Sequence, residues 1–307
     1  MSAETVTIET NQKAAIRPEA SPWRIAVRRF SQNRLALAGL VILILMVIIC
    51  AFGPVISPYH LDDYKLSDKN LSPNAKYWLG TDKFGRDILL RTMLAGRISL
   101  TVGLVATFIS VMIGATLGAL AGFYRKGVDT VIMRIADIFM ALPTLPLLII
   151  LGAVLSDLKV DPSNRIYFLM LIIGVLSWTS LSRLVRGQIL TLREQEFMQA
   201  TEALGLRDRR KIFRHLLPNT IPTIIVTATL GVAGAIITES ALSYLGIGVV
   251  PPTPSWGNMI SAANNLIDFR KRPWIWVPPG MCILITVVAI NLIGDGLRDA
   301  LDPKMKK

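Results

Sequence analysis

The chain contains 307 residues, of which 52% are hydrophobic and 18% charged; its formal net charge is +12 and its mean hydropathy +0.51. Soluble domains carry about 25% charged residues, so this composition argues against a soluble fold, and its apolar content excludes disorder. Basic nucleic-acid-binding domains rarely contain membrane-length apolar segments, so we expect no nucleic-acid partner. The two cysteines, Cys50 and Cys282, lie in apolar runs, which rules out a secreted disulfide framework. What remains is a polytopic, all-α membrane protein.

Six apolar segments are long enough to cross a membrane, since a spanning helix needs about 20 predominantly apolar residues. The first follows a polar, proline-containing stretch and no small-residue cleavage site comes after it, so we interpret it as a retained anchor. The chain therefore divides into an N-terminal segment (1–34), a first span with its loop (35–97), a core transmembrane region (98–300) and a tail (301–307). The predicted spans are 35–56, 98–124, 131–155, 166–184, 221–247 and 275–297.

The distribution of Lys and Arg orients these spans, because cytoplasmic segments carry an excess of both. The two termini and the connections after the second and fourth spans, counted together with the flanking Arg134 and Arg183, carry 21 of the 33 Lys and Arg residues, and the other side carries 12. We therefore expect both termini and the connection 185–219 in the cytoplasm.

The sequence lacks the motifs of most enzyme classes. No G-x-x-x-x-G-K-[ST] loop is present, so we expect no ATP bound through a phosphate loop of this chain. His60 and His215 are the only histidines and lie far apart, which gives a metal site or a hydrolytic triad little material. We expect no catalytic residue, no metal and no cofactor in this chain.

The fourth connection is too regular for a linker. Residues 194–204 are good helix formers and place Phe197, Ala200, Ala203 and Leu204 on one face. Gly205 follows where a left-handed residue would end the helix, Asp208 suits the N-cap of a second short helix, and Pro218 would end that helix. The prediction is a helix–glycine–helix elbow.

The elbow also carries a cluster of cations, namely Arg207, Arg209, Arg210, Lys211 and Arg214. Spacing alone leaves two interpretations open. The elbow either rests on anionic lipid headgroups or docks as an amphipathic helix into a groove on a cytoplasmic partner.

The elbow resembles a known motif. Gln199-Ala-Thr-Glu-Ala-Leu-Gly205, followed after eleven residues by Leu217-Pro218, resembles the EAA signature of ABC importer permeases, which reads E-A-A-x-x-x-G, nine residues, I-x-L-P. Gln199, Thr201 and His215 depart from it. The blocks 78–91, 251–260 and 294–303 resemble the C-type permease subunit of the oligopeptide, dipeptide and nickel subfamily.

This resemblance implies a six-span permease of the type I importer fold, in a bacterial cytoplasmic (inner) membrane, that imports di- or oligopeptides by alternating access. It implies four kinds of partner: a homologous B-type permease, two ABC ATPase subunits that hold ATP and Mg, an extracytoplasmic substrate-binding protein, and membrane lipid. The loop 195–218 would be the coupling helix region, with ATPase contacts at Gln199, Ala200, Glu202, Ala203, Gly205, Leu206 and Arg207.

Small residues recur every four positions in the second span, at Ala106, Ser110, Gly114, Gly118 and Gly122. Such a stripe lets another helix approach closely in lipid. The neighbouring helix is either another span of this chain or a span of the B-type permease.

Two acids lie within spans, and such residues are usually paired or face a cavity. Arg134 lies one turn before Asp137 and suits an i, i+3 pair. Glu239 has no cation near it in the sequence, so we expect it to face the translocation cavity or a partner span. It is also the residue on which two alternative functions would depend, a proton-coupled secondary carrier or an ATP-independent channel subunit.

The segment 251–257 lies on the outer side and contains Trp256. Together with Trp274 and Trp276 before the last span, it fits an aromatic anchor at the membrane interface.

Overall fold

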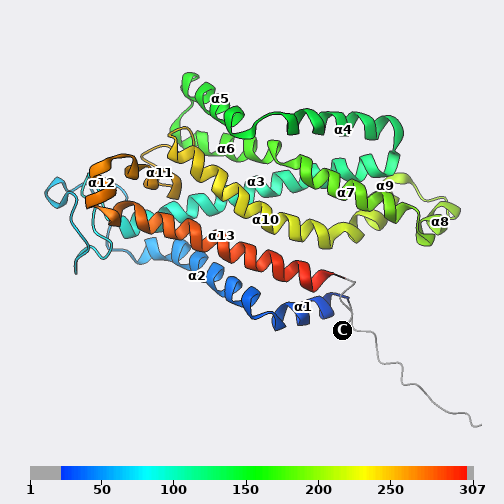
Figure 1. Ribbon diagram of the computed structural model, residues 1–307, viewed down its shortest axis with the longest axis horizontal. Coiled ribbons are helices and arrows are strands. Elements are labelled where there is room, and N and C mark those ends of the chain that lie inside the picture. Colours follow the sequence, from blue (N-terminus) through cyan, green and yellow to red (C-terminus); the bar gives the residue numbers. More distant parts are fainter. Residues whose placement is uncertain (1–21, 303–307) are drawn as a thin grey trace, which may run out of the picture.

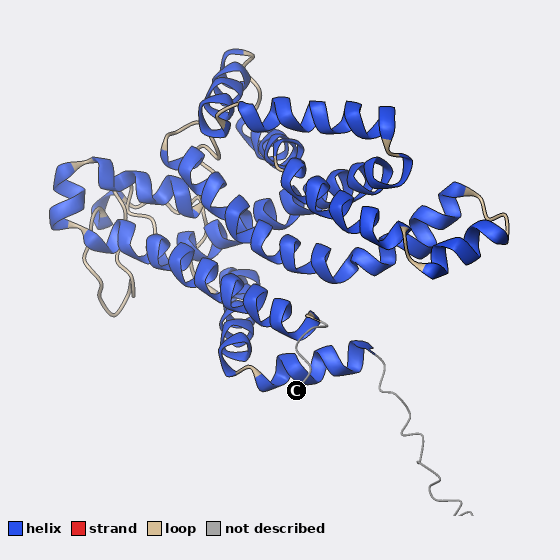
Figure 2. Cartoon of the chain, turned by 45° about the vertical axis from the view of Figure 1, so that its right-hand side comes forward, coloured by secondary structure: helices blue, strands red, loops and turns tan. Residues whose placement is uncertain are grey.

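The computed structural model describes residues 22–302, so most of the predicted N-terminal segment and the end of the tail lie outside the described residues. Within that range the chain forms helices and loops but no β-strand (Figure 2). The α-helices are α1 Pro22–Gln32, α2 Arg34–Ile56, α3 Ile88–Tyr124, α4 Lys126–Ala141, α5 Thr144–Asp157, α6 Pro162–Leu176, α7 Trp178–Arg193, α8 Glu196–Ala203, α9 Asp208–Arg210, α10 Leu217–Tyr244, α11 Trp256–Ile260, α12 Leu266–Lys271 and α13 Pro273–Leu301.

The long helices lie side by side, with the loop 57–87, α11 and α12 at one end and α8 and α9 at the other (Figure 1). We call the second the elbow end. In the described residues, five helical segments are long and apolar enough to cross a membrane, and a bent pair of helices makes a possible sixth span. The predicted all-α class is therefore confirmed, and the bent pair is the candidate for the third of the six predicted spans.

The third predicted span differs from a straight helix. α4 and α5 meet at an angle of 83° across Leu142 and Pro143. Proline disfavours helical geometry in the residue before it and has no N–H to donate. The apolar pattern therefore continues through 131–155 while the helix axis does not.

α3 begins at Ile88 and not at residue 98, where its apolar run starts. The Asp87 carboxylate caps the first turn by accepting a backbone N–H at 2.7 Å. Arg97 is polar, but its Nε donates to the carbonyl of Cys50 at 2.8 Å. Contacts of this kind with other segments stabilise a helical conformation in residues 88–97, which hydropathy assigns to the outer loop.

The second half of the elbow also departs from the prediction. α9 continues through the π-helical segment η2 Lys211–Leu216 into α10, so Pro218 lies in the first turn of a long helix and does not end a short one. The π-helical turn shifts the hydrogen-bond register just before Pro218, so the helix continues past a residue that has no N–H to donate. Arg207 is the N-cap, and Asp208 lies in the first turn, where its charge suits the helix dipole.

The small-residue stripe of α3 faces α7 of the same chain. A Cβ added at Gly118 would lie 2.5 Å from the carbonyl oxygen of Ser182, and one at Gly122 would lie 2.9 Å from that of Arg186. Gly114 meets the carbonyl of Trp178 in the same way, at 2.8 Å. In this chain the close neighbour of the stripe is therefore an internal span, and α3 and α7 approach backbone to backbone.

Candidate functional site

α8 presents most of its side chains to the surface. Thr201 and Met198 are buried, and Leu206 is half-buried. The other residues that we expect at a partner contact are exposed, namely Gln199, Ala200, Glu202, Ala203, Gly205 and Arg207. Leu204 is 76% exposed. Of the predicted apolar face, Phe197 packs against the core of the bundle, while Ala200, Ala203 and Leu204 are exposed and available to another surface.

Gly205 ends α8 in the left-handed conformation, with φ +66°. Its N–H donates to the carbonyl of Glu202 at 2.9 Å, and the N–H of Leu206 donates to the carbonyl of Thr201 at 3.2 Å. This pair of bonds is a Schellman cap, in which glycine avoids the penalty of a Cβ. The structure therefore has the turn at Gly205, where the sequence predicted it.

The elbow is rooted in the bundle through three side chains that are at most 1% exposed, Met198, Ile212 and Leu216. They share a core cluster with Phe123 of α3 and Ile189 of α7. Because well-packed cores transmit displacement and do not absorb it, a force on α8 would reach α3 and α7.

Thr201 occupies the position where the EAA signature has its second alanine. Its Oγ1 donates to the carbonyl of Met198 at 2.7 Å inside the elbow. This departure from the motif therefore falls on the bundle side of α8. The other departure in α8, Gln199, falls on the exposed side.

Ion pairs join the helices near the elbow. Arg186 of α7 donates to both carboxylate oxygens of Asp129 of α4, at 2.5 and 2.6 Å. Asp137 pairs with Arg183 of α7 and not with Arg134, so that expectation is wrong. A carboxylate can pair with a cation on its own helix or with one on a facing helix. Sequence spacing reveals only the cations on the same helix.

The elbow cations border a groove on the surface. Arg207, Arg209, Arg210 and Arg214 line it together with Phe213 and Pro218. Lys211 is partly neutralised by Asp208, at 3.6 Å. The elbow therefore combines the apolar patch around Leu204 with a strongly basic flank.

Glu239 of α10 is 0% exposed and lies among hydroxyls. Ser99 Oγ donates to it at 2.9 Å and Ser243 Oγ at 2.7 Å. In this conformation Glu239 therefore faces α3 and the end of its own helix, and the expectation that it faces the translocation cavity or a partner span stays a prediction. A chain of hydroxyls satisfies a buried carboxyl without a cation.

The same network holds the segment after α10. The N–H of Trp256 donates to Ser99 Oγ at 3.3 Å, and its indole Nε1 donates to the carbonyl of Thr92 at 3.0 Å. Trp256 is 0% exposed and packs against Gly96, where an added Cβ would lie 2.8 Å from the ring. The expectation of an interfacial anchor is therefore wrong for Trp256, because its N–H finds a partner inside the protein.

The loop before α3 is fastened by a polar cluster. Asp68 accepts hydrogen bonds from Lys76 Nζ at 2.8 Å and from the Tyr77 hydroxyl at 2.7 Å. These bonds lower the pKa of Asp68 to about 2, and the bond to Asp68 raises the pKa of Lys76. For Tyr77, burial is the main cause of a raised pKa. The cluster therefore stays charged and intact in any ordinary buffer.

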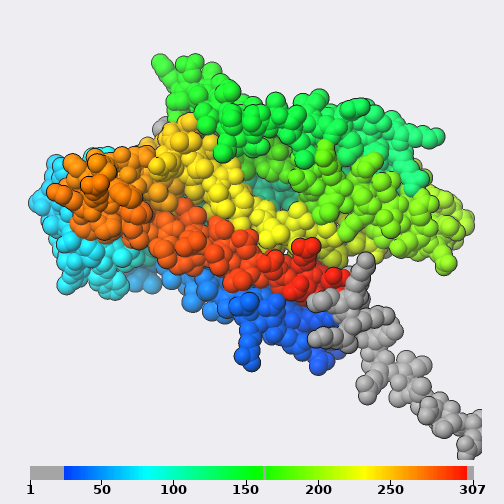
Figure 3. Space-filling view, in the orientation of Figure 1, coloured from blue at the N-terminus to red at the C-terminus, as the bar shows by residue number. Residues whose placement is uncertain are grey.

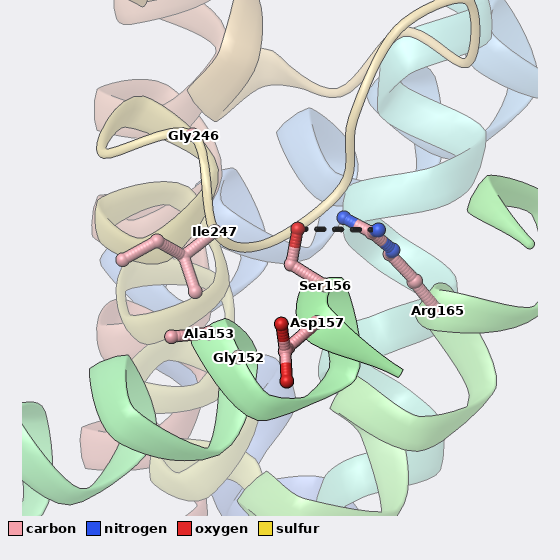
Figure 4. A pocket seen from close by; sticks show the side chains of 7 residues that line it. All are labelled: Gly152, Ala153, Ser156, Asp157, Arg165, Gly246 and Ile247. Atoms are coloured by element: carbon pink, nitrogen blue, oxygen red, sulfur yellow. Dashed lines mark hydrogen bonds between the residues drawn. The ribbon is translucent and has the colours of Figure 1, made fainter. Parts of the chain in front are cut away.

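A pocket of about 490 Å³ lies at the end opposite the elbow, between the end of α5, α6 and the turn after α10 (Figure 4). Asp157 and Arg165 are its charged residues. Arg165 Nη2 donates to Ser156 Oγ at 3.4 Å, and Nε donates to the carbonyl of Val160 at 3.1 Å. The arginine therefore ties α6 to the end of α5.

Among residues 22–302 no group of three or more His, Cys, Asp and Glu side chains comes close enough to hold a metal ion. The features described so far are a bundle of membrane-length helices and a rooted elbow with an uncovered apolar face. They define the membrane subunit of a multi-part transport system, a permease.

Comparisons with known proteins give the family. The family model described as binding-protein-dependent transport system inner membrane component matches residues 114–307, and a model of the N-terminal transmembrane domain of oligopeptide transport permease C matches residues 21–73. The chain belongs to the first of these families, the permease subunits of ABC importers. Its fold is that of the type I permeases, and it is a multi-pass membrane protein.

Curated relatives cover nearly the whole chain. The dipeptide transport system permease protein of Alkalihalophilus pseudofirmus is 41% identical over 93% of this chain and 91% of its own length. The oligopeptide transport system permease protein of Bacillus subtilis is 39% identical over 94% and 91%. The glutathione transport system permease protein of Pectobacterium atrosepticum is 36% identical over 93% and 92%.

Proposed function

We propose that this chain is a permease subunit of an ATP-driven importer of di- or oligopeptides and forms half of the translocation pathway. Support for the peptide substrate comes from the dipeptide and oligopeptide permeases among its relatives. Support for the mode of driving comes from the elbow. α8 exposes Leu204, Ala200 and Ala203 while Met198 roots it in the bundle, an arrangement suited to receiving a push from a separate protein.

In this proposal two ABC ATPase subunits bind and hydrolyse ATP with Mg, and one of them seats α8 in a groove on its surface. The exposed residues Gln199, Ala200, Glu202, Ala203 and Gly205 make that contact, with Leu206 and Arg207 at its edge. Closure of the ATPases then displaces α8, and the rooted elbow carries the movement to α3 and α7. This chain supplies no cofactor.

The remaining partners follow from the same assembly. A homologous B-type permease completes the pathway, and an extracytoplasmic substrate-binding protein delivers peptide at the end opposite the elbow. The chain lies in the bacterial inner membrane with both termini and the elbow in the cytoplasm, in agreement with the excess of Lys and Arg in those segments.

A proton-coupled carrier is disfavoured by the surroundings of Glu239. A relay carboxyl must exchange protons with both sides of the membrane in turn. Glu239 is 0% exposed and held by Ser99 and Ser243. No other observation on the described residues favours a carrier or a channel.

Docking at α8 is tested by introducing a charge on the exposed apolar patch. We expect Leu204→Asp to abolish co-purification of the ATPase subunits, because the carboxylate would be buried without a partner. Leu158→Asp is the matched control, since Leu158 is 68% exposed at the opposite end. Retention of the ATPases by both variants would show that α8 is not their seat.

The energy source is tested with the assembled complex in liposomes. Peptide uptake should require ATP inside and should persist when a protonophore removes the proton gradient. Uptake that proceeds with a proton gradient and no ATP would overturn the ABC mechanism for this chain.

A further inference from the structure

A cavity of about 260 Å³ lies inside the bundle, between α3, the α6–α7 junction and α10. In Figure 3 the surface is hollowed between α7 and α10, with α3 at the floor. Its lining is mostly apolar and contains no charged residue. The polar or backbone-exposing residues on it are Thr107, Ser110, Ser177, Ser180, Thr227 and Gly231.

Thr107 lacks the backbone hydrogen bond that several threonines of the long helices make, as does Thr286 of α13. A helical threonine ordinarily donates its hydroxyl to the carbonyl four residues earlier. Thr101 does so to Arg97 at 2.6 Å, and Thr227 does so to Thr223 at 2.9 Å. Thr107 is 8% exposed and its Oγ1 has no hydrogen-bond partner among the described residues. Its hydroxyl is therefore a donor without a partner at the wall of the cavity.

Gly231 of α10 lies across from this hydroxyl. A Cβ added there would be 3.3 Å from Thr107 Cγ2 and 3.7 Å from its Oγ1. Any larger side chain at Gly231 would therefore extend into the cavity beside the hydroxyl. Gly234, one turn further along α10, has no atom within 4 Å of its added Cβ and does not line the cavity.

The size and lining define what fits. Small-molecule pockets typically measure roughly 300–1,000 Å³, so a cavity of about 260 Å³ takes a fragment of a peptide and not a whole one. Apolar walls suit an uncharged side chain, and the unpartnered hydroxyl of Thr107 suits one backbone amide. A lipid acyl chain would fill the space but leave the Thr107 hydroxyl without a partner.

We propose that this cavity is a passage subsite of the transporter, which holds an apolar side chain of the moving peptide while the Thr107 hydroxyl donates to an adjacent peptide carbonyl. The inference rests on the proposed function, peptide import. It adds the residues that contact the peptide at one step of its passage and the chemical class of side chain that they accept. With no charge in the lining, the subsite attracts neither peptide terminus, so a peptide is held weakly enough to leave.

The test uses the complete complex in liposomes, with ATP inside and L-alanyl-L-leucine as the probe, and measures uptake and ATP hydrolysis together. We expect Gly231→Leu to lower the maximal uptake rate about tenfold, since it fills the place of the peptide side chain. Uptake by Gly234→Leu should stay within about twofold of wild type. Both variants should keep the half-saturating peptide concentration, which the binding protein sets, and the rate of ATP hydrolysis.

The hydroxyl is tested separately. Thr107→Val should lower uptake per ATP about threefold, because an isosteric methyl cannot donate to the peptide, and Thr107→Ser should restore it. Thr101→Val is the control on the same helix, because its hydroxyl bonds only its own backbone. A loss caused by misfolding would lower ATP hydrolysis and uptake in proportion, and co-purification of the ATPases checks assembly.

The outcomes separate this proposal from the one on which it rests. A wild-type complex that imports no peptide overturns the proposed function and the subsite with it. If the wild type imports L-alanyl-L-leucine and Gly231→Leu matches Gly234→Leu, or Thr107→Val matches wild type, the subsite proposal alone is overturned.

Discussion

Gly205 and Thr201 have different structural roles within the elbow. Gly205 turns the chain through a backbone conformation that a Cβ would strain, and Thr201 satisfies its hydroxyl on the inner side of α8. Neither side chain reaches outward. The outer surface of α8 is therefore set by its neighbours, and the two residues fix how that surface is aimed.

Replacement of Gly205 by valine should uncouple the transporter. A β-branched residue at φ +66° costs about 1–2 kcal/mol, so the Schellman cap would open and α8 would lose its fixed direction. We expect the stimulation of ATP hydrolysis by peptide-loaded binding protein to fall severalfold. The assay compares stimulated and basal hydrolysis in the reconstituted complex.

Gly187→Val is the matched control for this variant. Gly187 lies within α7 with a right-handed conformation and no atom within 4 Å of an added Cβ. Valine is a better helix former than glycine, so stimulation should stay at the wild-type level. Equal behaviour of the two variants would mean that the turn at Gly205 has no part in coupling.

At the scale of the helices, the packed root of α8 suits this helix to the proposed role of a lever. Met198, Ile212 and Leu216 close a cluster with residues of α3 and α7, and Arg186 joins α7 to α4 through Asp129. Removing the root should therefore loosen the elbow without touching its outer surface.

Met198→Ala should destabilise the elbow by about 2–5 kcal/mol, the usual cost of truncating a buried methionine. The ATPases should still bind, because the exposed face of α8 is intact, but less peptide should be imported per ATP. The control is Met112→Ala, at a methionine of α3 that is 55% exposed. Unchanged coupling in Met198→Ala would contradict the lever.

How far the helices could be predicted depends on what fixes each of them. Hydropathy located the first span and most of the last two, since a long apolar run has few other structures open to it in lipid. It missed the start of α3, because Arg97 is polar and its bond to the carbonyl of Cys50 is a contact between distant segments that hydropathy does not reveal. The Gly205 turn was predictable, since glycine conformation is local. Which face of α8 is buried was not, because α3 and α7 decide it.

The candidate site divides in the same way. The positions proposed to contact the ATPases follow from a local motif, and most of them are exposed in the structure. The partner of Asp137, the enclosure of Glu239 and the free hydroxyl of Thr107 depend on contacts between distant segments. A cavity has no sequence pattern of its own, so nothing in the composition of α3 or α10 indicated the one beside Thr107.

At the scale of the whole molecule, each end of the bundle is fastened separately. At the elbow end the ties are the core around Met198 and the arginine–aspartate pairs of α7 and α4. At the other end Glu239 and Trp256 share Ser99 as a partner, so α3, α10 and the segment leading into α11 move together. Under the proposed coupling, a push on α8 would therefore travel along α3 as a rigid displacement and reach the far end of the bundle.

The proposed coupling requires the two ends of the bundle to lie on opposite sides of the membrane, with the elbow inside. Helix α1 and the loop 57–87 lie toward opposite ends of the bundle (Figure 1). Ser31 of α1 and Ser72 of this loop are both exposed. Each becomes a single cysteine in a background where Cys50 and Cys282, the two cysteines of the chain, are replaced by alanine. A membrane-impermeant maleimide should label Ser72→Cys in intact spheroplasts and Ser31→Cys only after permeabilisation. Because the pair shares one substitution and one background, the reverse pattern would place the elbow outside, where no ATPase could reach it.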